Sequence, residues 1–320
     1  MTQKLGLAIN VKELKPRPNH LKNYYEIAER ADEAGLYYLG FPNMVSKGVP
    51  GIETFTYMTS IATHTENIML GTDVWQLPLY HPIQIALIGS TIDIISGGRF
   101  ICNSGAGTIR EEFENLGMSF DDRGKRMNEI LDIIKKLWTE PVVNYSGKFY
   151  NLKNVVCIKP IQEPHPPIWI GGGSGAALKR VVKYADAWAG VTWPAFIFKQ
   201  EEGFSVTGLI EKLKKYSKEY GRDPKTVGVN LRIHMNINTN REKAVEDVVK
   251  HFDVHRKGRV GGGGTAEQQI KWAVLGPAEA VIEKIKETYK LGADLVILWP
   301  MTTDLKSQWE RIEKEVIPSM

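Results

Sequence analysis

The stretch Pro167 to Gly190 reads PIWIGGGSGAALKRVVKYADAWAG. It holds a short apolar run, a glycine-rich turn, an amphipathic segment and a second apolar run. The apolar residues of the amphipathic segment recur at the three- and four-residue spacing of one helix face: Leu178, Val181, Val182 and Ala185. A strand, a helix and a second strand in this order are typical of a βαβ unit, whose two strands run parallel. The stretch therefore predicts a parallel sheet covered by helices.

The same alternation of apolar, β-branched runs with helical stretches continues on both sides of this unit. Eight runs are expected to be strands: residues 4–9, 36–41, 67–74, 99–104, 167–171, 186–191, 227–237 and 294–300. Eight strands that alternate with helices predict an α/β fold, a (β/α)8 TIM barrel. A doubly wound open sheet is the structural alternative, although such sheets usually have fewer strands. We expect residues 1–320 to form a single barrel domain.

Two segments interrupt the alternation and are expected to be insertions. Residues 141–167 carry turn and strand residues without a helical period. Residues 254–276 include four consecutive glycines, Gly261 to Gly264, which local propensity cannot hold in a regular element. A loop of this length in a barrel is often a lid over the site, and disorder without a function is the alternative.

Charge and composition exclude several classes of partner. The chain has 41 basic and 37 acidic residues, a net charge of +4, and this small, scattered excess does not favour nucleic acid. No apolar run approaches the roughly 20 residues that span a bilayer. The amino terminus has too short an apolar run for a signal peptide, and the two cysteines suggest no disulfide framework. We therefore expect a cytoplasmic protein without a membrane partner.

In a parallel barrel the chemistry lies at the carboxyl ends of the strands, and the glycine-rich turn GGGSG occupies one such end. It runs into a helix amino terminus, where unpaired N–H groups and the helix dipole favour an anion. Glycines let that backbone approach a phosphate closely, and the Ser174 hydroxyl can add a donor. The alternative is a tight turn in which Ser174 is only the helix cap.

Other polar and aromatic residues near strand ends are weaker candidates. Asp73 follows an apolar strand and could accept a hydrogen bond from a cofactor ring N–H, or act as a cap. His81 precedes Pro82 at a helix start and could donate a proton, or be structural. Three tryptophans near strand ends suit a planar or apolar ligand, although tryptophan also packs in cores: Trp75, Trp193 and Trp299.

Several chemistries lack their sequence signals. Glu111 and Glu112 begin a helix, where the dipole alone accounts for acidic residues. No His, Asp or Glu cluster has metal-ligand spacing, so no metal is expected. The GxSxG elbow of serine hydrolases is missing, and the glycine-rich turn fits neither the dinucleotide fingerprint nor the Walker A pattern.

Taken together, these segments resemble the bacterial-luciferase-like monooxygenase family over nearly the whole chain. The most specific match is Ser60 to Gly107, with an LG-T turn, a His-Pro before the helix, a D-x-x-S-G-G-R turn and a glycine-rich fourth-strand tip. Three further segments are similar to later parts of the sequences in that family: residues 111–138, 166–190 and 275–300.

The resemblance implies a flavin-dependent oxidoreductase, with reduced FMN and oxygen acting on a small, partly apolar substrate. The implied cofactor-binding residues are Gly172, Gly173, Ser174 and Gly175 for the phosphate, and Thr72, Asp73, Asn103, Ser104 and Gly105 for the ring. Asp73 and His81 are the default catalytic candidates. The resemblance also implies a homodimer or homotetramer and a separate flavin reductase as partner.

The resemblance also leaves alternatives open. Coenzyme F-420, a deazaflavin, would pass a hydride without activating oxygen. Many family members carry a histidine at the second-strand tip, where this chain has Asn43, and several deazaflavin enzymes carry a glutamate where this chain has Thr108. A non-catalytic flavin-binding protein is therefore a second hypothesis, and a phosphosugar isomerase or aldolase is a third.

Overall fold

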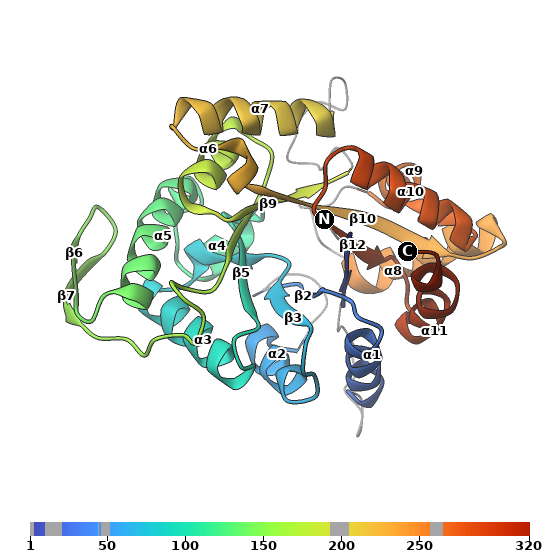
Figure 1. The fold of residues 1–320 in the computed structure, drawn as a ribbon, viewed down its shortest axis with the longest axis horizontal. Coiled ribbons are helices and arrows are strands. Elements are labelled where there is room, and N and C mark those ends of the chain that lie inside the picture. The colour runs from blue at the N-terminus through green and yellow to red at the C-terminus, as the bar shows by residue number, and fades with distance from the viewer. Residues whose placement is uncertain (1–2, 10–20, 44, 46–51, 193–204, 257–264) are drawn as a thin grey trace.

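The computed structural model describes residues 3–9, 21–43, 45, 52–192, 205–256 and 265–320, with backbone alone for 254–256. Its centre is a ring of eight strands (Figure 1): β1 (Lys4–Ala8), β2 (Tyr38–Phe41), β3 (Met69–Thr72), β5 (Phe100–Gly105), β8 (Ile168–Gly171), β9 (Ala187–Val191), β10 (Gly228–Ile237) and β12 (Leu295–Pro300). Each strand pairs in parallel with its neighbours in chain order, and β12 returns to β1. The ring is closed, so the predicted (β/α)8 barrel is confirmed and the open sheet is wrong.

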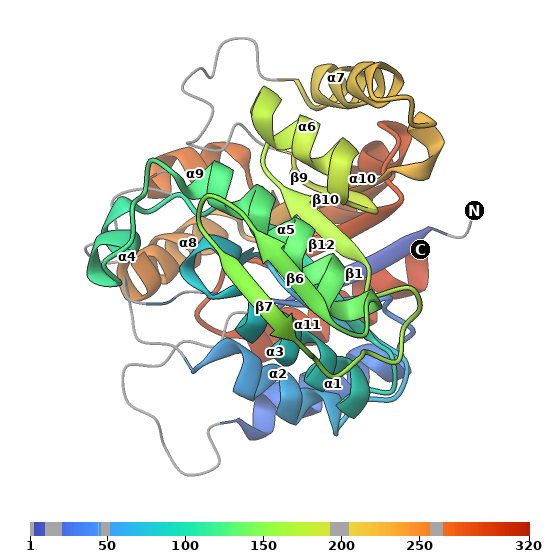
Figure 2. The ribbon, with the colours of Figure 1, turned by 90° about the vertical axis from the view of Figure 1, so that its left-hand side faces the viewer.

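Helices surround this ring, as Figure 2 shows from a second side. They are α1 (Lys22–Glu33), α2 (Thr54–Ala62), α3 (Pro82–Ile95), α4 (Arg110–Asn115), α5 (Arg123–Thr139), α6 (Gly175–Tyr184), α7 (Val206–Glu219), α8 (Arg241–Arg256), α9 (Ala266–Trp272), α10 (Ala278–Lys290) and α11 (Leu305–Arg311). Strand β4 (Trp75–Gln76) adds a short pairing to β5 at the carboxyl end of the barrel.

Alternation along the strands separates the core between barrel and helices from the barrel interior. On β10 the residues Val229, Leu231 and Ile233 belong to the main core, which the helices cover. The residues between them therefore face the barrel axis. A second buried cluster fills that interior and includes residues of six strands: Ala8, Tyr38, Ile101, Trp169, Ala187, Leu295 and Ile297.

The first expected insertion is a two-stranded antiparallel hairpin that projects from the barrel at the left of Figure 1. Its strands are β6 (Val143–Ser146) and β7 (Asn151–Val155). The Glu129 carboxylate of α5 accepts hydrogen bonds from the backbone N–H groups of Lys148 and Phe149 at 2.9 and 3.0 Å. This buttress fixes the hairpin turn against the barrel.

The second expected insertion is more regular than its composition predicts. Helix α8 runs to Arg256, and α9 and β11 (Val274–Gly276) come after it, so a loop through residues 265–276 is wrong. The Thr265 side chain caps α9 in a capping box with Gln268, and β11 pairs with β10. Local capping and sheet pairing therefore order this segment. The proposed lid glycines, Gly261 to Gly264, lie outside the described residues.

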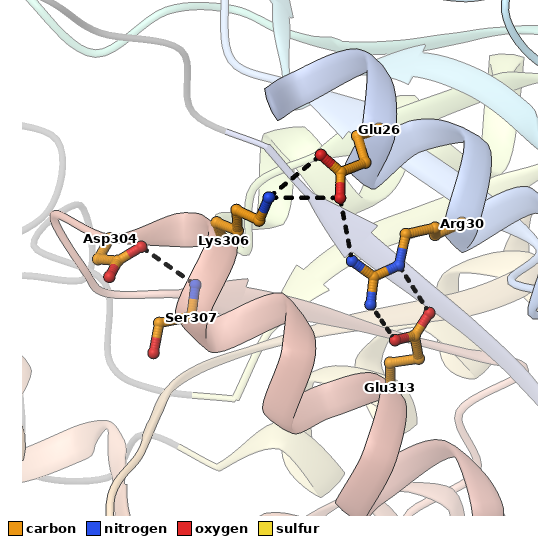
Figure 3. A network of polar contacts seen from close by, with 6 residues as sticks. All are labelled: Glu26, Arg30, Asp304, Lys306, Ser307 and Glu313. Carbon is orange, nitrogen blue, oxygen red and sulfur yellow. Dashed lines mark hydrogen bonds and ion pairs between the residues drawn. The ribbon is translucent and has the colours of Figure 1, made fainter. Parts of the chain in front are cut away.

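A network of charges ties the end of the chain to its beginning (Figure 3). The Arg30 guanidinium of α1 bonds to the Glu313 carboxylate, and Lys306 of α11 bonds to Glu26 at 3.2 Å. Lys306 holds the pKa of the Glu26 carboxyl below its ordinary value, and Glu313 raises the pKa of Arg30. Because these ion pairs are partly exposed, each contributes little to the free energy of unfolding. Their main effect is to position α11 and the residues after it against α1.

None of the described helices is both long and apolar enough to span a membrane.

Candidate functional site at the carboxyl end of the barrel

An ion pair crosses the barrel interior at its carboxyl end. Asp73 directly follows β3, and its Oδ1 atom accepts a hydrogen bond at 2.9 Å from Nη1 of Arg232 on β10. The two strands lie on opposite sides of the ring, with three strands between them on either side. Both side chains must therefore point inward, and their pair forms a polar floor above the apolar interior.

Burial sets the electrostatics of this pair. The Asp73 side chain is 5% exposed and that of Arg232 is 20% exposed. Burial raises the pKa of the Asp73 carboxyl, and the Arg232 guanidinium works against that shift. Arg232 also lies over the Trp299 ring, 4.4 Å from its centroid, and this contact supports the cation from the β12 side.

Two buried acceptor atoms at this floor have no hydrogen-bond partner among the described residues: Oδ2 of Asp73 and Oδ1 of Asn103. Asn103 is fully buried on β5, and its amide nitrogen lies 3.4 Å from the Tyr38 hydroxyl. Buried acceptors without a partner cost free energy, so their presence together is a reason to look for a ligand that donates to them.

The other residues proposed for the ring side use their side chains within the protein. The Thr72 hydroxyl donates to the Asn103 carbonyl at 2.5 Å, and the Ser104 hydroxyl donates to the Trp169 carbonyl at 2.9 Å. Gly105 packs so closely on Val74 that an added Cβ would lie 2.8 Å from its Cγ2 atom. Within this predicted group, Asp73 and Asn103 are therefore the two side chains with a buried oxygen that has no hydrogen-bond partner among the described residues.

The glycine-rich turn after β8 has the geometry of a tight turn that opens a helix. Gly172 has a φ of +107°, which favours glycine, and Ser174 Oγ accepts the Ala177 N–H at 3.2 Å. Ser174 is thus the cap of α6, and its hydroxyl proton remains for donation. Ser174 and Gly175 are exposed at the first turn of α6, where backbone N–H groups lack helical partners.

Replacing Ser174 with alanine should lower the free energy of unfolding by about 0.5–2 kcal/mol, because the cap of α6 is lost. Replacement with glycine should cost only a few tenths of a kcal/mol, because glycine is a tolerated cap residue. Urea unfolding of the two variants beside the parent protein measures the difference. An alanine variant as stable as the parent would show that the hydroxyl contributes nothing as a cap.

None of the hydrogen bonds and ring contacts of His81 with the described residues involves Asp73 or the floor. Its Nδ1 atom accepts the Ile83 N–H at 3.3 Å in a capping box with Gln84. Its ring packs edge-on against Tyr150, beyond the hairpin, with centroids 5.4 Å apart. The contacts of His81 are those of a helix cap on the outer layer.

A buried polar cluster that the sequence did not reveal lies beside the second-strand tip. Glu112 of α4 is fully buried and accepts from Gln76 Nε2 at 2.9 Å and from the Val45 N–H at 3.2 Å. Asn43 is also buried and donates to the Tyr80 hydroxyl at 3.0 Å. From the sequence, the helix dipole alone accounts for Glu112 as an acidic residue at the start of a helix. Its burial depends on the loops that meet it.

Arg232 is the site residue that sequence reasoning missed. The strand VNLRIHMN (residues 229–236) alternates apolar and polar residues, with Asn230, Arg232 and His234 at every second position. In a barrel covered by helices the apolar set must face the helices, so the polar set faces inward. That alternation was the signal that could have found it.

The three tryptophans of the expected aromatic rim do not act together. Trp75 is fully buried in the core outside the barrel and packs against Phe55 at 4.3 Å between ring centroids, so its expected place at the rim is wrong. Trp299 faces the interior and is partly exposed. Trp193 lies outside the described residues. Of these three tryptophans, Trp299 is the one that the described structure places at the barrel interior.

The residues present fit a flavin-type cofactor. The unpartnered oxygens of Asp73 and Asn103 match the N–H donors of an isoalloxazine or deazaflavin ring, and the exposed first turn of α6 suits its phosphate. The described residues contain no group of three or more His, Cys, Asp or Glu side chains that could hold a metal. The unpartnered oxygens and the exposed helix turn together suit a ligand that carries both N–H donors and a phosphate.

A closed parallel barrel with its polar groups gathered at the carboxyl ends of the strands is the architecture of a barrel enzyme. The family model described as luciferase-like monooxygenase matches residues 6–295. The chain therefore belongs to the luciferase-like monooxygenase family, whose oxidoreductases use a flavin or coenzyme F-420. Membership in this family of enzymes argues against a non-catalytic flavin-binding protein and against an isomerase or aldolase.

Relatives match parts of the chain, and a solved structure matches all of it. A protein of unknown activity from Sinorhizobium fredii is 27% identical over 47% of this chain and 41% of its own length. The oxygenase component of a flavin-dependent trigonelline monooxygenase from Acinetobacter baylyi is 33% identical over 36% of this chain and 33% of its own. Both alignments thus span less than half of the relative.

The solved structure of an F-420-dependent secondary alcohol dehydrogenase, in complex with an F-420–acetone adduct, superposes with a TM-score of 0.80 at 18% identity. It covers 100% of this chain and 99% of that one. At this identity the likeness establishes the fold.

Proposed function

We propose that this protein is a flavin-dependent monooxygenase that uses reduced FMN and oxygen on a small, partly apolar substrate. The observation that carries the proposal is the pair of buried acceptors, Asp73 Oδ2 and Asn103 Oδ1, at the carboxyl end of the barrel. The family membership and the trigonelline monooxygenase relative support the reaction class.

The protein's own residues would bind and orient the cofactor. Asp73 and Asn103 would accept hydrogen bonds from ring N–H groups. The turn formed by Gly172, Gly173, Ser174 and Gly175 would hold the phosphate. When bound, reduced FMN supplies the two electrons that reduce one oxygen atom to water while the other enters the substrate.

Arg232 keeps Asp73 in its place, and the apolar residues beneath the floor exclude water from below. The partly exposed Trp299 offers an apolar surface to the substrate. These contacts would orient the ligand and keep water away from it.

Two assembly features belong to the same proposal. Reduced FMN must be supplied from elsewhere, and the relative's name as an oxygenase component supports a separate flavin reductase as partner. A homodimer or homotetramer is the assembly we expect.

Coenzyme F-420 is the second candidate, with hydride transfer to or from the substrate. A structure that superposes on the whole chain holds this coenzyme, which supports this candidate. The acceptors at Asp73 and Asn103 suit both rings, since a flavin and a deazaflavin share the same pyrimidine N–H and carbonyl edge. These two acceptors therefore do not distinguish the candidates. The two reactions differ in whether oxygen is consumed.

Titration of the protein with FMN and with F-420, each oxidised and anaerobically reduced, tests the proposal through changes in absorbance and fluorescence. We expect saturable binding of one of them and about 10- to 100-fold weaker binding by Asp73→Asn, since hydrogen bonds to charged groups contribute about 1.5–3 kcal/mol. Asp121→Asn is the control, because Asp121 is an exposed partner of Arg110.

Oxygen uptake with reduced FMN then separates the monooxygenase from the F-420 enzyme. Consumption of oxygen that depends on the protein supports the first candidate, and hydride transfer to F-420 without oxygen supports the second. Failure of both cofactors to bind, or equal affinities of the parent and the Asp73→Asn variant, would contradict the proposed site.

A further inference from the structure

One histidine lies at the barrel mouth without a role in the floor. Alternation on β10 directs Arg232 and His234 to the same, inner side. In the register with β12, Arg232 is opposite Ile297 and His234 is opposite Trp299, one inward position closer to the carboxyl end. His234 therefore lies above the Asp73–Arg232 floor, on the side from which a substrate would enter.

A buried glutamine orients this histidine. Gln269 of α9 is fully buried, and its Oε1 atom lies 2.5 Å from Nδ1 of His234. A carboxamide oxygen can only accept a hydrogen bond, so Nδ1 carries the hydrogen of the neutral ring. The lone pair is then on Nε2, which makes that atom the basic one.

The surroundings of the ring are partly apolar and partly charged. The Trp299 ring lies 5.6 Å from the His234 ring between centroids. The Arg232 guanidinium also lies over the Trp299 ring. Asp73 forms its ion pair with Arg232 across the barrel.

We propose that His234 is the proton-transfer residue of this site and that Gln269 is its positioning residue. The inference rests on the proposed function. Asn43 and Thr108, which follow the ends of β2 and β5, exchange no proton near neutral pH. Nε2 takes the proton of a substrate O–H or N–H bond, the bonding electron pair stays on the oxygen or nitrogen, and the imidazolium later releases the proton to water.

Long-range ¹H–¹⁵N spectra of the histidine rings test the orientation without any activity assay. The chain has 7 histidines, and the signals of His234 are identified by their loss in His234→Gln. We expect the Nδ1–H tautomer in the parent protein, its loss in Gln269→Leu and its retention in Gln269→Glu, whose carboxylate also accepts. An Nε2–H tautomer in the parent protein overturns the proposal even if a variant fails to fold.

Saturation with FMN or with F-420 tests whether His234 lies at the ligand. We expect the His234 ring signals to shift on saturation, while those of His64, which is exposed and bonded to Glu29, stay in place. In turnover, His234→Gln should lose about 10²–10⁴-fold in kcat and its pH dependence, with cofactor affinity unchanged within about threefold. His64→Gln is the matched control.

The outcomes separate this inference from the proposed function. Binding of a cofactor with unmoved His234 signals, or full turnover by His234→Gln, overturns the role of His234 and leaves the function standing. If neither cofactor binds, the proposed function fails, and the role of His234 in it fails with it, while the parent's tautomer still decides whether Gln269 orients the ring.

Discussion

Replacing Arg232 with methionine is expected to lower the free energy of unfolding by about 3–4 kcal/mol at pH 7. The change leaves the Asp73 carboxylate, 5% exposed, without its cation inside the barrel. Breaking a buried pair in this way typically costs about 3–5 kcal/mol. Protonation of Asp73 limits the cost, because neutralising a carboxyl with an ordinary pKa near 4 requires about 1.4 kcal/mol per pH unit.

The loss should therefore depend on pH in a defined direction. In the variant the folded-state pKa of Asp73 is raised above its unfolded value, because burial acts on it without Arg232. The destabilisation is then largest above the raised pKa and shrinks as the pH falls through it toward the unfolded value. Urea unfolding at pH 5 and pH 8 measures this, and a loss that is equal at both would contradict the account.

The double variant Asp73→Asn with Arg232→Met is the matched control. It removes both charges, so it should recover much of the stability lost by Arg232→Met alone. A double variant no more stable than Arg232→Met would mean that the arginine stabilises through its packing on Trp299 rather than through its charge.

The second large effect is expected at Asp93, the first residue of the D-x-x-S-G-G-R turn. The Asp93 side chain is fully buried at the end of α3 and accepts from the Ile161 and Gln162 N–H groups at 2.7 and 2.9 Å and from the Gln162 amide at 2.6 Å. Asp93→Ala should cost about 3–5 kcal/mol, because several buried donors lose their acceptor at once.

Asp186→Ala provides the comparison, since the exposed Asp186 accepts one backbone N–H, that of Ile168, at 2.7 Å. We expect a loss of about 1 kcal/mol there. Limited proteolysis should also cut the Asp93→Ala variant within residues 141–167, which the carboxylate fastens to the barrel. Resistance equal to that of the parent would show that the contacts of Glu129 hold residues 141–167 without those of Asp93.

The other residues of the D-x-x-S-G-G-R turn also have a structural role. Ser96 and Arg99 of the same turn are buried too, and Arg99 donates to the backbone carbonyls of Ala62, Thr65 and Ile68. The motif that points most specifically to the family thus fastens loops at the amino-terminal end of the barrel. It identifies the fold and lies away from the floor at Asp73.

Local patterns were sufficient for the barrel and for the position of its mouth. Alternation with period two, helical spacing and turn glycines are short-range properties, and they predicted all eight strands of the ring. Ser174 was recognisable as a cap for the same reason, because a cap depends on residues within one turn. By itself the sequence therefore determined the fold, the family and the end of the barrel at which chemistry is expected.

The composition of the site was decided by the tertiary structure. Asp73 and Arg232 are 159 residues apart, and they meet only because closure of the ring sets β3 opposite β10. Gln269 reaches His234 because residues 265–276 fold as a helix and a strand. Periodicity shows which face of a strand is buried but not which side chains meet across the barrel, since that depends on how many strands close the ring and in what register.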